Sequence, residues 1–443
     1  MKQAKTVAYL SVFVLLAGDA IRNTFSWAGW GAICAVLAGF TIHWLVKNKP
    51  LGVIKQTPWP LTALLALMLL STIWSNYQLV TFGVFFIQIV QTLFAIFLAA
   101  AFSWRELLRI LSNVIRTILG LSLLLELYAA AIVRGPVAPV FKFYEGDKPP
   151  APDFYWCRGN LFNGGRIQGI VGNSNILAYV AMIGVILFLV ELSIGQSRRW
   201  VSLLSVVGSA AALVDAWSMT VNFALAAVVL ASVVSIAAEG QTKETRHRYY
   251  RTAWWATGVS ALVVLAFRAQ LFELLGKSPD ISGRTKIWKA VLHLIDQRPL
   301  QGWGWSSYWI PFLQPYKGLV VIHNVTYLQA HNAFLDVWLQ LGVLGLGLFI
   351  CLIGYTFVPL WRLAVRHTNP LYLWPILVFV GLIVQNFTES RLLIEIGWVL
   401  LVLFAVKSRD PEESLEPRTG EVKRIRLLVG GLRRNQSRRQ KDR

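Results

Sequence analysis

The chain contains few cysteines and few charged side chains for its 443 residues. Cys34, Cys157 and Cys351 are scattered, and only Cys157 falls in a segment that we expect outside the membrane. The sequence therefore predicts neither a disulfide framework nor a thiolate metal site. Charged residues make up only 14% of the chain and hydrophobic residues 56%. This balance excludes a soluble globular domain and indicates a polytopic membrane protein.

The sequence also lacks the patterns of a metalloenzyme. It has no HExxH motif, no clustered pair of carboxylates and no third ligand at a suitable spacing, so we expect neither a metal nor a cofactor. No cleavable signal peptide precedes the first apolar run, and the first helix is expected to remain as an anchor. No internal repeat and no soluble catalytic domain is recognisable.

Apolar runs long enough to cross about 30 Å of hydrocarbon occur about a dozen times. They lie near 6–21, 26–46, 58–74, 79–102, 107–133, 173–194, 200–216, 219–238, 251–268, 333–360, 370–387 and 390–406. With a cytoplasmic N-terminus, every short inner connection carries lysine or arginine, as the positive-inside rule requires. We expect an all-α membrane domain of about 12 transmembrane helices over residues 1–406, with both termini in the cytoplasm.

Two external connections, at about 134–172 and 269–332, are too long to be simple turns. They hold most of the basic residues expected outside, beside Gly, Asn and His at helix entrances. Long loops cross a membrane whatever their charge, but this placement favours a binding role. The basic segment 407–443 predicts a disordered cytoplasmic tail that touches anionic lipids or binds a partner. A lipid bilayer therefore explains the net charge of +20 without nucleic acid.

The end of the first long loop is rich in glycine and asparagine. Asn173 and Asn175 are placed to cap the helix that follows, and an outward-facing helix N-terminus is a ready anion site. Arg158 and Arg166 add positive charge beside it. Ordinary capping with arginines at the interface is the alternative interpretation.

The second long loop contains a helical pattern, with apolar residues at Ile287, Trp288, Val291, Leu292 and Ile295. Ser282 is expected to cap this helix and Pro299 to end it. The pattern predicts an amphipathic helix on the outer membrane surface. Arg284 lies in its first turn, where a guanidinium can grip phosphate oxygens in pairs or can anchor the helix to lipid headgroups.

Histidine is scarce, and the sequence AHN at Ala330 to Asn332 falls where the second loop enters a membrane helix. A neutral imidazole there can accept a proton from a hydroxyl that attacks. We therefore identify His331 as the candidate base, with Asn332 as a residue that fixes its tautomer or binds sugar. His323 is a weaker candidate. In the last outer turn, Glu389 and Arg391 are expected to pair with each other or to face the same cavity.

These motifs together resemble the O-antigen ligase and O-antigen polymerase (Wzy-type) superfamily. The resemblance spans about 155–395 and rests on the Asn-rich helix entry, GRTKIW at Gly283 to Trp288, PLQGWG at Pro299 to Gly304 and AHNAFL…LGVLG at Ala330 to Gly345. It implies a membrane glycosyltransferase with a GT-C-like fold, acting without metal on an undecaprenyl-pyrophosphate-linked glycan donor. It also implies that His331 activates the hydroxyl of a glycan or lipid-core acceptor, while Arg284 and Arg166 hold the pyrophosphate.

The chain departs from that family at one place. Many relatives carry an arginine near the outer turn between the seventh and eighth spans, and the sequence DAWSMTVNF at Asp215 to Phe223 has none. Arg158 or Arg391 is expected to supply the charge, or the protein is a divergent or non-catalytic glycolipid-binding member. The resemblance places the protein in the bacterial inner membrane, with its site facing the periplasm or the exterior. Its motifs do not separate ligase from polymerase, and a polysaccharide-lipid transporter or flippase remains a separate alternative.

Overall fold

The computed structural model describes residues 2–141, 154–237, 283–322, 325–367 and 369–409, with isolated positions between 241 and 255. Residues 1–408 form one structural unit. The expected span at 251–268, the start of the second long loop and the tail from 410 lie outside the described residues, apart from a few positions at 251–255.

The described chain is largely helical. The longer helices are α1 (Lys2–Leu16), α2 (Gly18–Asn48), α3 (Leu51–Lys55), α4 (Trp59–Leu70), α5 (Gln78–Ala101), α6 (Trp104–Leu127), α7 (Ser174–Ser193), α8 (Arg199–Ala216), α9 (Met219–Ala237), α12 (Arg284–Gln297), α13 (Ala333–Arg366), α14 (Trp374–Gln385) and α15 (Glu395–Lys407). Single turns are η1 (Ser71–Ile73), η2 (Tyr128–Val133), η4 (Gly169–Val171), η6 (Pro370–Leu373) and η7 (Arg391–Leu393). Two short strands, β1 (Val321–Ile322) and β2 (Val325–Thr326), pair antiparallel, with Val321 opposite Thr326.

Six helices in the described part of the chain are long and apolar enough to cross a membrane. They are Gly18–Asn48, Gln78–Ala101, Trp104–Val133, Ser174–Ser193, Arg199–Ala216 and Ala333–Arg366. Shorter apolar helices occupy Trp59–Ile73, Met219–Val234 and Pro370–Gln385. The expectation of an all-α membrane protein is therefore confirmed, while the number of twelve crossings stays a prediction.

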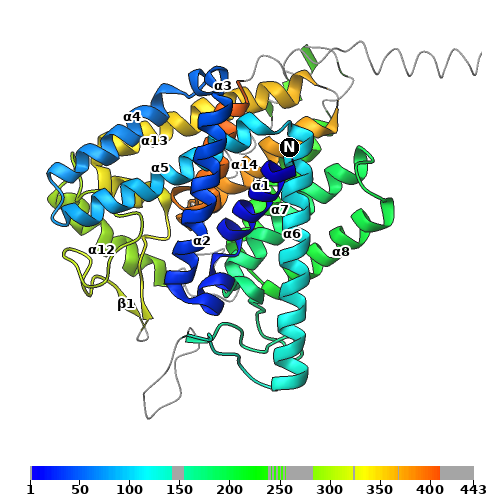
Figure 1. Cartoon of the computed structure of the whole chain (residues 1–443), viewed down its shortest axis with the longest axis horizontal. Helices are drawn as coiled ribbons and strands as arrows, with labels where there is room; N and C mark the ends of the chain where they lie inside the picture. Colours follow the sequence, from blue (N-terminus) through cyan, green and yellow to red (C-terminus); the bar gives the residue numbers. More distant parts are fainter. Residues whose placement is uncertain are drawn as a thin grey trace, which may run out of the picture. The chain divides into compact units, whose positions relative to one another are not determined.

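The core is built around helices that are apolar on every side. Each residue of α15 from Ile396 to Lys407 is buried, and α7 is buried along most of its length. A helix that is apolar all round lies in a protein core or in a bilayer, and here other helices cover most of both. Accordingly, α7 packs against α6, α8, α9 and α14, and α15 packs against α5 and α13. Figure 1 shows α4 and α13 side by side at another part of the bundle.

The PLQGWG segment pairs with a break in α13. Gly342 has φ +68° inside this helix, and a Cβ there would lie 1.9 Å from the carbonyl oxygen of Leu300. The break frees backbone groups that bond to the segment instead: Val343 N–H donates to Pro299 O at 3.0 Å, and Gly304 N–H donates to Gln340 O at 2.9 Å. The two glycine-containing motifs are thus far apart in sequence but in direct contact, and only glycine permits this close approach.

The helix expected from the second loop forms as α12, but its apolar face does not lie on the membrane. Ile287, Val291, Leu294 and Ile295 are buried in a second core cluster with Trp303, Trp309, Tyr316 and Leu339. Leu292, assigned to the apolar face from the sequence, is instead 41% exposed. The pattern correctly predicted the helix but not what covers its apolar face, because the same spacing of apolar residues suits a face covered by lipid and one covered by protein. Gly283 is the N-cap, and Ser282 lies outside the described residues.

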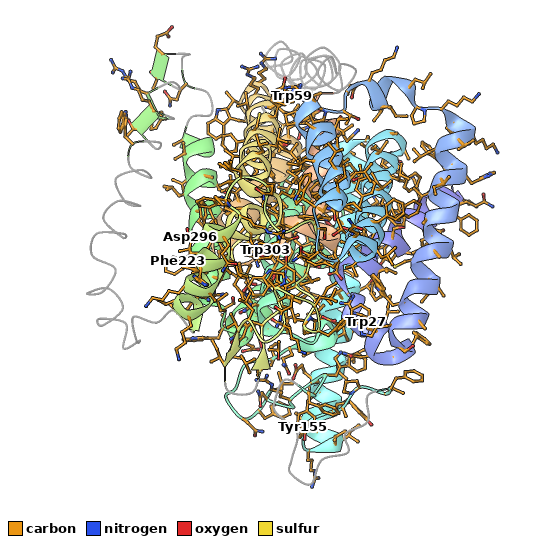
Figure 2. The ribbon with its side chains drawn as sticks, turned by 90° about the vertical axis from the view of Figure 1, so that its left-hand side faces the viewer. Trp27, Trp59, Tyr155, Phe223, Asp296 and Trp303 are labelled. Carbon is orange, nitrogen blue, oxygen red and sulfur yellow. The ribbon has the colours of Figure 1, made fainter. Side chains whose placement is uncertain are left out.

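The connections expected outside the membrane meet at one end of the helices. Figure 2 shows Tyr155, from the first long loop, toward one end and Trp59, from an inner connection, toward the other. Near the start of α2, Arg22 forms ion pairs with Asp19 of the same helix and with Glu395 at the start of α15. This shared end also carries the candidate site.

Candidate functional site

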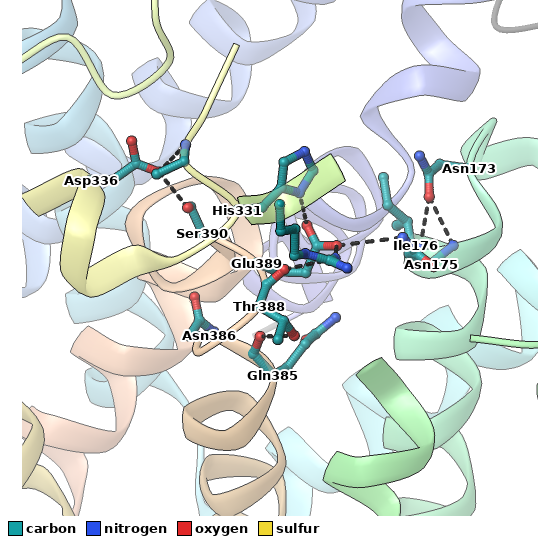
Figure 3. Close-up of polar contacts among 12 residues, drawn as sticks. Asn173, Asn175, Ile176, His331, Asp336, Gln385, Asn386, Thr388, Glu389 and Ser390 are labelled. Carbon is teal, nitrogen blue, oxygen red and sulfur yellow. Dashed lines mark hydrogen bonds and ion pairs between the residues drawn. The ribbon is translucent and has the colours of Figure 1, made fainter. Parts of the chain in front are cut away.

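The carboxylate of Glu389 lies at the centre of a polar cluster. Its Oε2 is 3.0 Å from His331 Nδ1, and its Oε1 is 3.1 Å from Arg284 Nη2. Asn175 Nδ2 donates to the same Oε1 at 3.4 Å. Figure 3 shows His331 and Asn175 reaching Glu389 from different elements. Segments distant in sequence, at the starts of α7, α12 and α13 and after α14, therefore converge on one buried carboxylate.

His331 is held in a constrained backbone conformation just before α13. Its φ is +49°, a left-handed value that is uncommon for residues other than glycine and clusters at functional sites. The next peptide is fixed because Ala333 N–H donates to Asn386 O and Glu389 O at 3.0 and 3.1 Å. The side chain is 21% exposed, and Tyr327 contacts its ring edge to face.

The contact with Glu389 determines the protonation geometry of the imidazole. A carboxylate accepts hydrogen bonds, so Nδ1 of His331 carries the donating proton and Nε2 holds the lone pair. Among the described residues no hydrogen-bond partner occupies Nε2. This nitrogen can take a proton from a bound hydroxyl.

Positive groups keep Glu389 ionised despite its burial. Burial by itself raises the pKa of a carboxyl group. Here the opposing effects of His331, Arg391 and Arg284, together with the hydrogen bond from His331, lower the pKa of Glu389 below its ordinary value of 4.5. The pair Glu389–His331 therefore has a fixed negative charge behind the candidate base.

Arg284 extends from the first residue of α12 into this cluster. Its Nη2 donates to Thr388 O at 2.9 Å as well as to Glu389. Its buried Nε has no hydrogen-bond partner among the described residues. A partly exposed guanidinium with an unsatisfied donor is suited to an anionic oxygen supplied by a ligand.

Arg391 does not form the ion pair expected with Glu389. The ion pairs of Glu389 are with Arg284 and His331, which reach it from other elements, and Arg391 acts on it only at longer range. Arg391 borders a small cavity with Tyr179 and Glu395, and its guanidinium has no hydrogen bond within the described part of the chain. Burial would lower the pKa of Arg391, but Tyr308, Glu389 and other acidic groups raise it, so the side chain stays charged.

Arg166 occupies the turn where the expected family arginine is missing. Its Nε donates to Ala216 O at 2.8 Å, and its Nη2 donates to Asn175 Oδ1 at 2.6 Å. Ser218 also donates to Asn175 Oδ1, at 3.0 Å. Arg166 therefore places a positive charge at the α8–α9 turn, and whether Arg158 or Arg391 adds to it stays a prediction. Burial and the nearby charge of Arg158 both lower the pKa of Arg166.

Two predicted site residues are helix caps. Asn173 Oδ1 accepts from Asn175 N–H and Ile176 N–H at the start of α7, as expected. Asn332 Oδ1 accepts from Phe334 N–H and Leu335 N–H, and its Nδ2 donates to Phe387 O. The group that fixes the tautomer of His331 is therefore Glu389 and not Asn332. His323 lies outside the described residues.

Asp336 is a residue that the sequence reasoning missed. It is fully buried, and its Oδ2 accepts from Ala330 N–H, at 3.0 Å, and from the hydroxyl of Ser390. Its Oδ1 accepts from the indole N–H of Trp309 at 2.9 Å. Ala330 precedes His331 and Ser390 follows Glu389, so one carboxylate ties together the two segments that carry the pair. An acidic residue in a first helical turn normally indicates only a favourable helix dipole, which hid this role.

Glu126 is a second buried carboxylate that supports the site from another helix, α6. Its buried Oε1 accepts from Gln168 N–H and Gly169 N–H, at 2.7 and 2.8 Å. Gly169 has φ +58°, and a Cβ there would meet Ser122 at 2.4 Å. Glu126 therefore fixes the loop that brings Arg166 to the start of α7.

The chemistry of the cluster is that of an anion site next to a base. Arg284, Arg391, Arg166 and Arg158 supply positive charge, and His331 supplies a proton acceptor. In the described residues, no group of three His, Cys, Asp or Glu side chains is placed to hold a metal ion. The donor set suits a phosphate or diphosphate ester with a hydroxyl bound beside it.

One comparison with known proteins matches this region. Residues 170–350 match a family model described as O-antigen ligase (Wzy_C), a stretch that includes Asn173, Arg284 and His331 and covers less than half of the chain. A comparison with curated proteins gives no significant match.

Proposed function

We propose that this membrane protein belongs to the O-antigen ligase-like superfamily, whose family model matches residues 170–350, and that it transfers a glycan from undecaprenyl pyrophosphate to an acceptor hydroxyl. The superfamily covers ligases and polymerases that act on lipid-linked glycans. The observation that carries the finer proposal is the Glu389–His331 pair beside arginines that have unused donors. We favour the ligase reaction, with a glycan or lipid-core acceptor.

The reaction is a single displacement at the anomeric carbon of the donor sugar. Nε2 of His331 accepts the proton of the acceptor hydroxyl as its oxygen forms the new glycosidic bond. The bond between the anomeric carbon and the pyrophosphate oxygen breaks, and its electron pair leaves with undecaprenyl pyrophosphate. Attack opposite the leaving group inverts the configuration at the anomeric carbon.

Guanidinium groups stabilise the charge that grows on the leaving group. Arg284 and Arg391 lie nearest to the pair, and Arg166 lies beyond Asn175, with Arg158 close to it. In this scheme they replace the divalent cation used by many transferases. Removing one such contact is expected to lower the rate by roughly a hundredfold, about 3 kcal/mol of barrier.

The same scheme sets the location of the protein. We propose a multi-pass protein of the bacterial inner membrane, with the site on the outer face and both termini in the cytoplasm. The inner connections support this orientation because each of them is short and carries lysine or arginine, as the positive-inside rule requires. The arginines at the outer end instead gather around Glu389.

The test is glycan transfer by purified protein with a synthetic lipid-linked donor. His331→Ala should fold, bind donor and lose about 10²- to 10⁴-fold in rate, the usual contribution of a general base. His293→Ala, an exposed histidine on α12, is the matched control and should transfer normally. Near-normal transfer by His331→Ala, or loss of wild-type activity in EDTA that Mg²⁺ or Mn²⁺ restores, would refute the scheme.

The product distinguishes the two reactions of the superfamily. A single-repeat donor mixed with a lipid-core acceptor should give one glycosylated acceptor if the protein is a ligase. A ladder of longer lipid-linked products without acceptor would instead identify a polymerase.

A further inference from the structure

An open cavity of about 490 Å³ borders Arg166. Gly164, Gly165 and Arg166 line it from the first long loop, and Asp215 and Trp217 line it from the end of α8. Its volume lies within the range of about 300–1,000 Å³ that small-molecule sites occupy. The base and the carboxylate at the centre of the polar cluster are not among its lining residues, so this cavity is separate from that cluster.

The two walls of the cavity are hydrogen-bonded to each other. Ile167 N–H donates to Asp215 O at 3.2 Å, and Arg166 Nε donates to Ala216 O at 2.8 Å. Asn160 Nδ2 donates to Arg166 O at 3.1 Å and braces the loop from within. The cavity is therefore preformed, which reduces the entropy that is lost when a ligand binds.

Trp217 is an unusual residue for its place in the chain. It caps the C-terminal end of α8 in a left-handed conformation, with φ +44°, where helices usually place glycine. Its side chain is 65% exposed, so burial in the core does not offset the backbone strain. A strained, exposed tryptophan at the edge of a cavity indicates a ligand that uses the ring.

The cavity combines this ring with one acidic and one basic side chain. Within the described part of the chain, neither the carboxylate of Asp215 nor Nη1 of Arg166 has a hydrogen-bond or ion-pair partner. An anion would meet the negative charge of Asp215, and a hydrocarbon chain would leave both charges without partners. A neutral ligand with several hydroxyl groups satisfies both, since hydroxyls donate to a carboxylate and accept from a guanidinium.

A pyranose sugar has this combination of surfaces. One face of its ring presents C–H groups that pack against an aromatic side chain, and its rim carries hydroxyls. At Gly164 an added Cβ would meet no atom within 4 Å, so this part of the wall leaves space for a ring. Arg166 also donates to Asn175, which reaches Glu389, so the cavity adjoins the polar cluster.

Resting on the function proposed above, we infer that this cavity binds one pyranose unit of a glycan, stacked on Trp217 with its hydroxyls on Asp215 and Arg166. The unit comes from the donor glycan or from the acceptor glycan, and the experiment distinguishes the two. The cavity then selects glycans by their sugars, whereas the diphosphate is common to all donors.

The test compares ligands that differ only in their sugars. One pair is the single-repeat donor and undecaprenyl diphosphate, and the other is the lipid-core acceptor and the same lipid without its core sugars. Affinities are measured from the shift in thermal unfolding that each compound produces. Trp217→Gly removes the ring and suits the left-handed backbone, so the unliganded variant should unfold at the wild-type temperature or above.

We expect Trp217→Gly to bind one of the two sugar-bearing compounds at least about tenfold more weakly, roughly the effect of one lost aromatic contact. The compound that loses affinity, donor or acceptor, identifies the source of the sugar. Both sugar-free compounds should bind as they bind the wild type.

Two further variants and a control accompany this measurement. Trp217→Phe keeps an aromatic face and should recover most of the affinity. Asp215→Ala, at an exposed position, removes the hydroxyl acceptor and should weaken the same compound as Trp217→Gly. Trp200→Ala replaces a tryptophan that is 58% exposed at the other end of α8, and this matched control should bind all four compounds normally.

Unchanged affinity for both sugar-bearing compounds would overturn the inference. Equal loss for sugar-bearing and sugar-free compounds would also overturn it, because Trp217 would then only anchor α8 at the membrane interface. These binding measurements do not require transfer. If the loss is selective for a sugar-bearing compound but the wild type transfers no glycan, the proposed function fails and the sugar site stands. If the wild type transfers glycan and the variants bind every compound normally, the proposed function stands and the sugar site fails.

Discussion

Glu389 determines which nitrogen of His331 carries a proton and which one is left with a lone pair. Its carboxylate also holds Arg284 and Asn175, so a single side chain sets the positions of the base and of one phosphate-binding candidate. The sequence identified His331, Arg284 and Arg166 because histidine and arginine are unusual at the entrance of apolar helices. It paired Glu389 with Arg391, since neighbours in a short turn were the only partners that sequence distance suggested.

Glu389→Gln should therefore impair turnover more than donor binding. The amide keeps the size of the side chain but removes the charge that orients and stabilises a protonated His331. We expect the rate to fall on the order of a hundredfold, less than for His331→Ala, with the KM for donor little changed. Steady-state transfer kinetics measure this. A Glu389→Gln variant with wild-type kcat would show that the carboxylate is only structural.

The same variant predicts a change with pH. The pKa of Glu389 is lowered in the folded protein, so its ionised form stabilises the fold above the ordinary value of 4.5. That stability is lost as the pH falls below 4.5 through the lowered value. Wild type should exceed Glu389→Gln by about 2 kcal/mol near neutral pH, and the gap should close in acid. A gap in thermal unfolding that does not change with pH would contradict the assignment.

Asp336 gives a separate prediction about positioning. Asp336→Asn leaves one acceptor oxygen for Ala330 N–H and Trp309 N–H, so one buried donor loses its partner. The expected cost is about 1–3 kcal/mol of stability, together with reduced kcat at unchanged donor KM. Asp296→Asn, at an exposed position on α12, is the control. Loss of stability with unaltered kcat would limit Asp336 to a structural role.

Glycine contacts position the elements around the site. The break of α13 at Gly342 leaves a short helix from Ala333 to Leu341 that carries Asn332 at its cap and His331 before it. The PLQGWG segment fills the break. The sequence singled out both motifs through a family resemblance, but nothing in their local pattern revealed that they contact each other.

Gly342→Ala tests this contact. The added Cβ would meet Leu300 O at 1.9 Å, and the φ of +68° is unfavourable for alanine. Overpacking and left-handed strain together should cost about 2–4 kcal/mol, so the unfolding temperature should fall clearly. Gly347→Ala, further along α13 with nothing within 4 Å of the added atom, should be neutral. Similar stability for both variants would contradict the proposed role of the break.

Most helix bounds were predictable, since an apolar run of membrane length allows few other structures. Described helices correspond to eleven of the expected runs, from α1 to α15, and the run at 251–268 lies outside the described residues, apart from a few positions at its start. The error concerned the environment of α12. Periodicity shows that a helix has an apolar face but does not show whether lipid or protein covers it, and here the second core cluster covers it.

At the scale of the whole molecule, the site depends on loops that are distant in sequence. Arg166, Arg284, His331 and Glu389 come from three connections that the sequence places outside the membrane, and their contacts run through Asn175 and Glu389. Local patterns predicted each connection separately. Their convergence follows from tertiary packing, and the local patterns of a single sequence do not show which distant segments come into contact.

The most direct test of the central claim is an electron cryomicroscopy map of the purified protein with bound undecaprenyl diphosphate. We predict diphosphate density on the side of His331 that presents Nε2. This density should lie within hydrogen-bond distance of Arg284 and of either Arg391 or Arg166. Density for the diphosphate at the opposite end of the helices, or away from His331 and these arginines, would contradict the account.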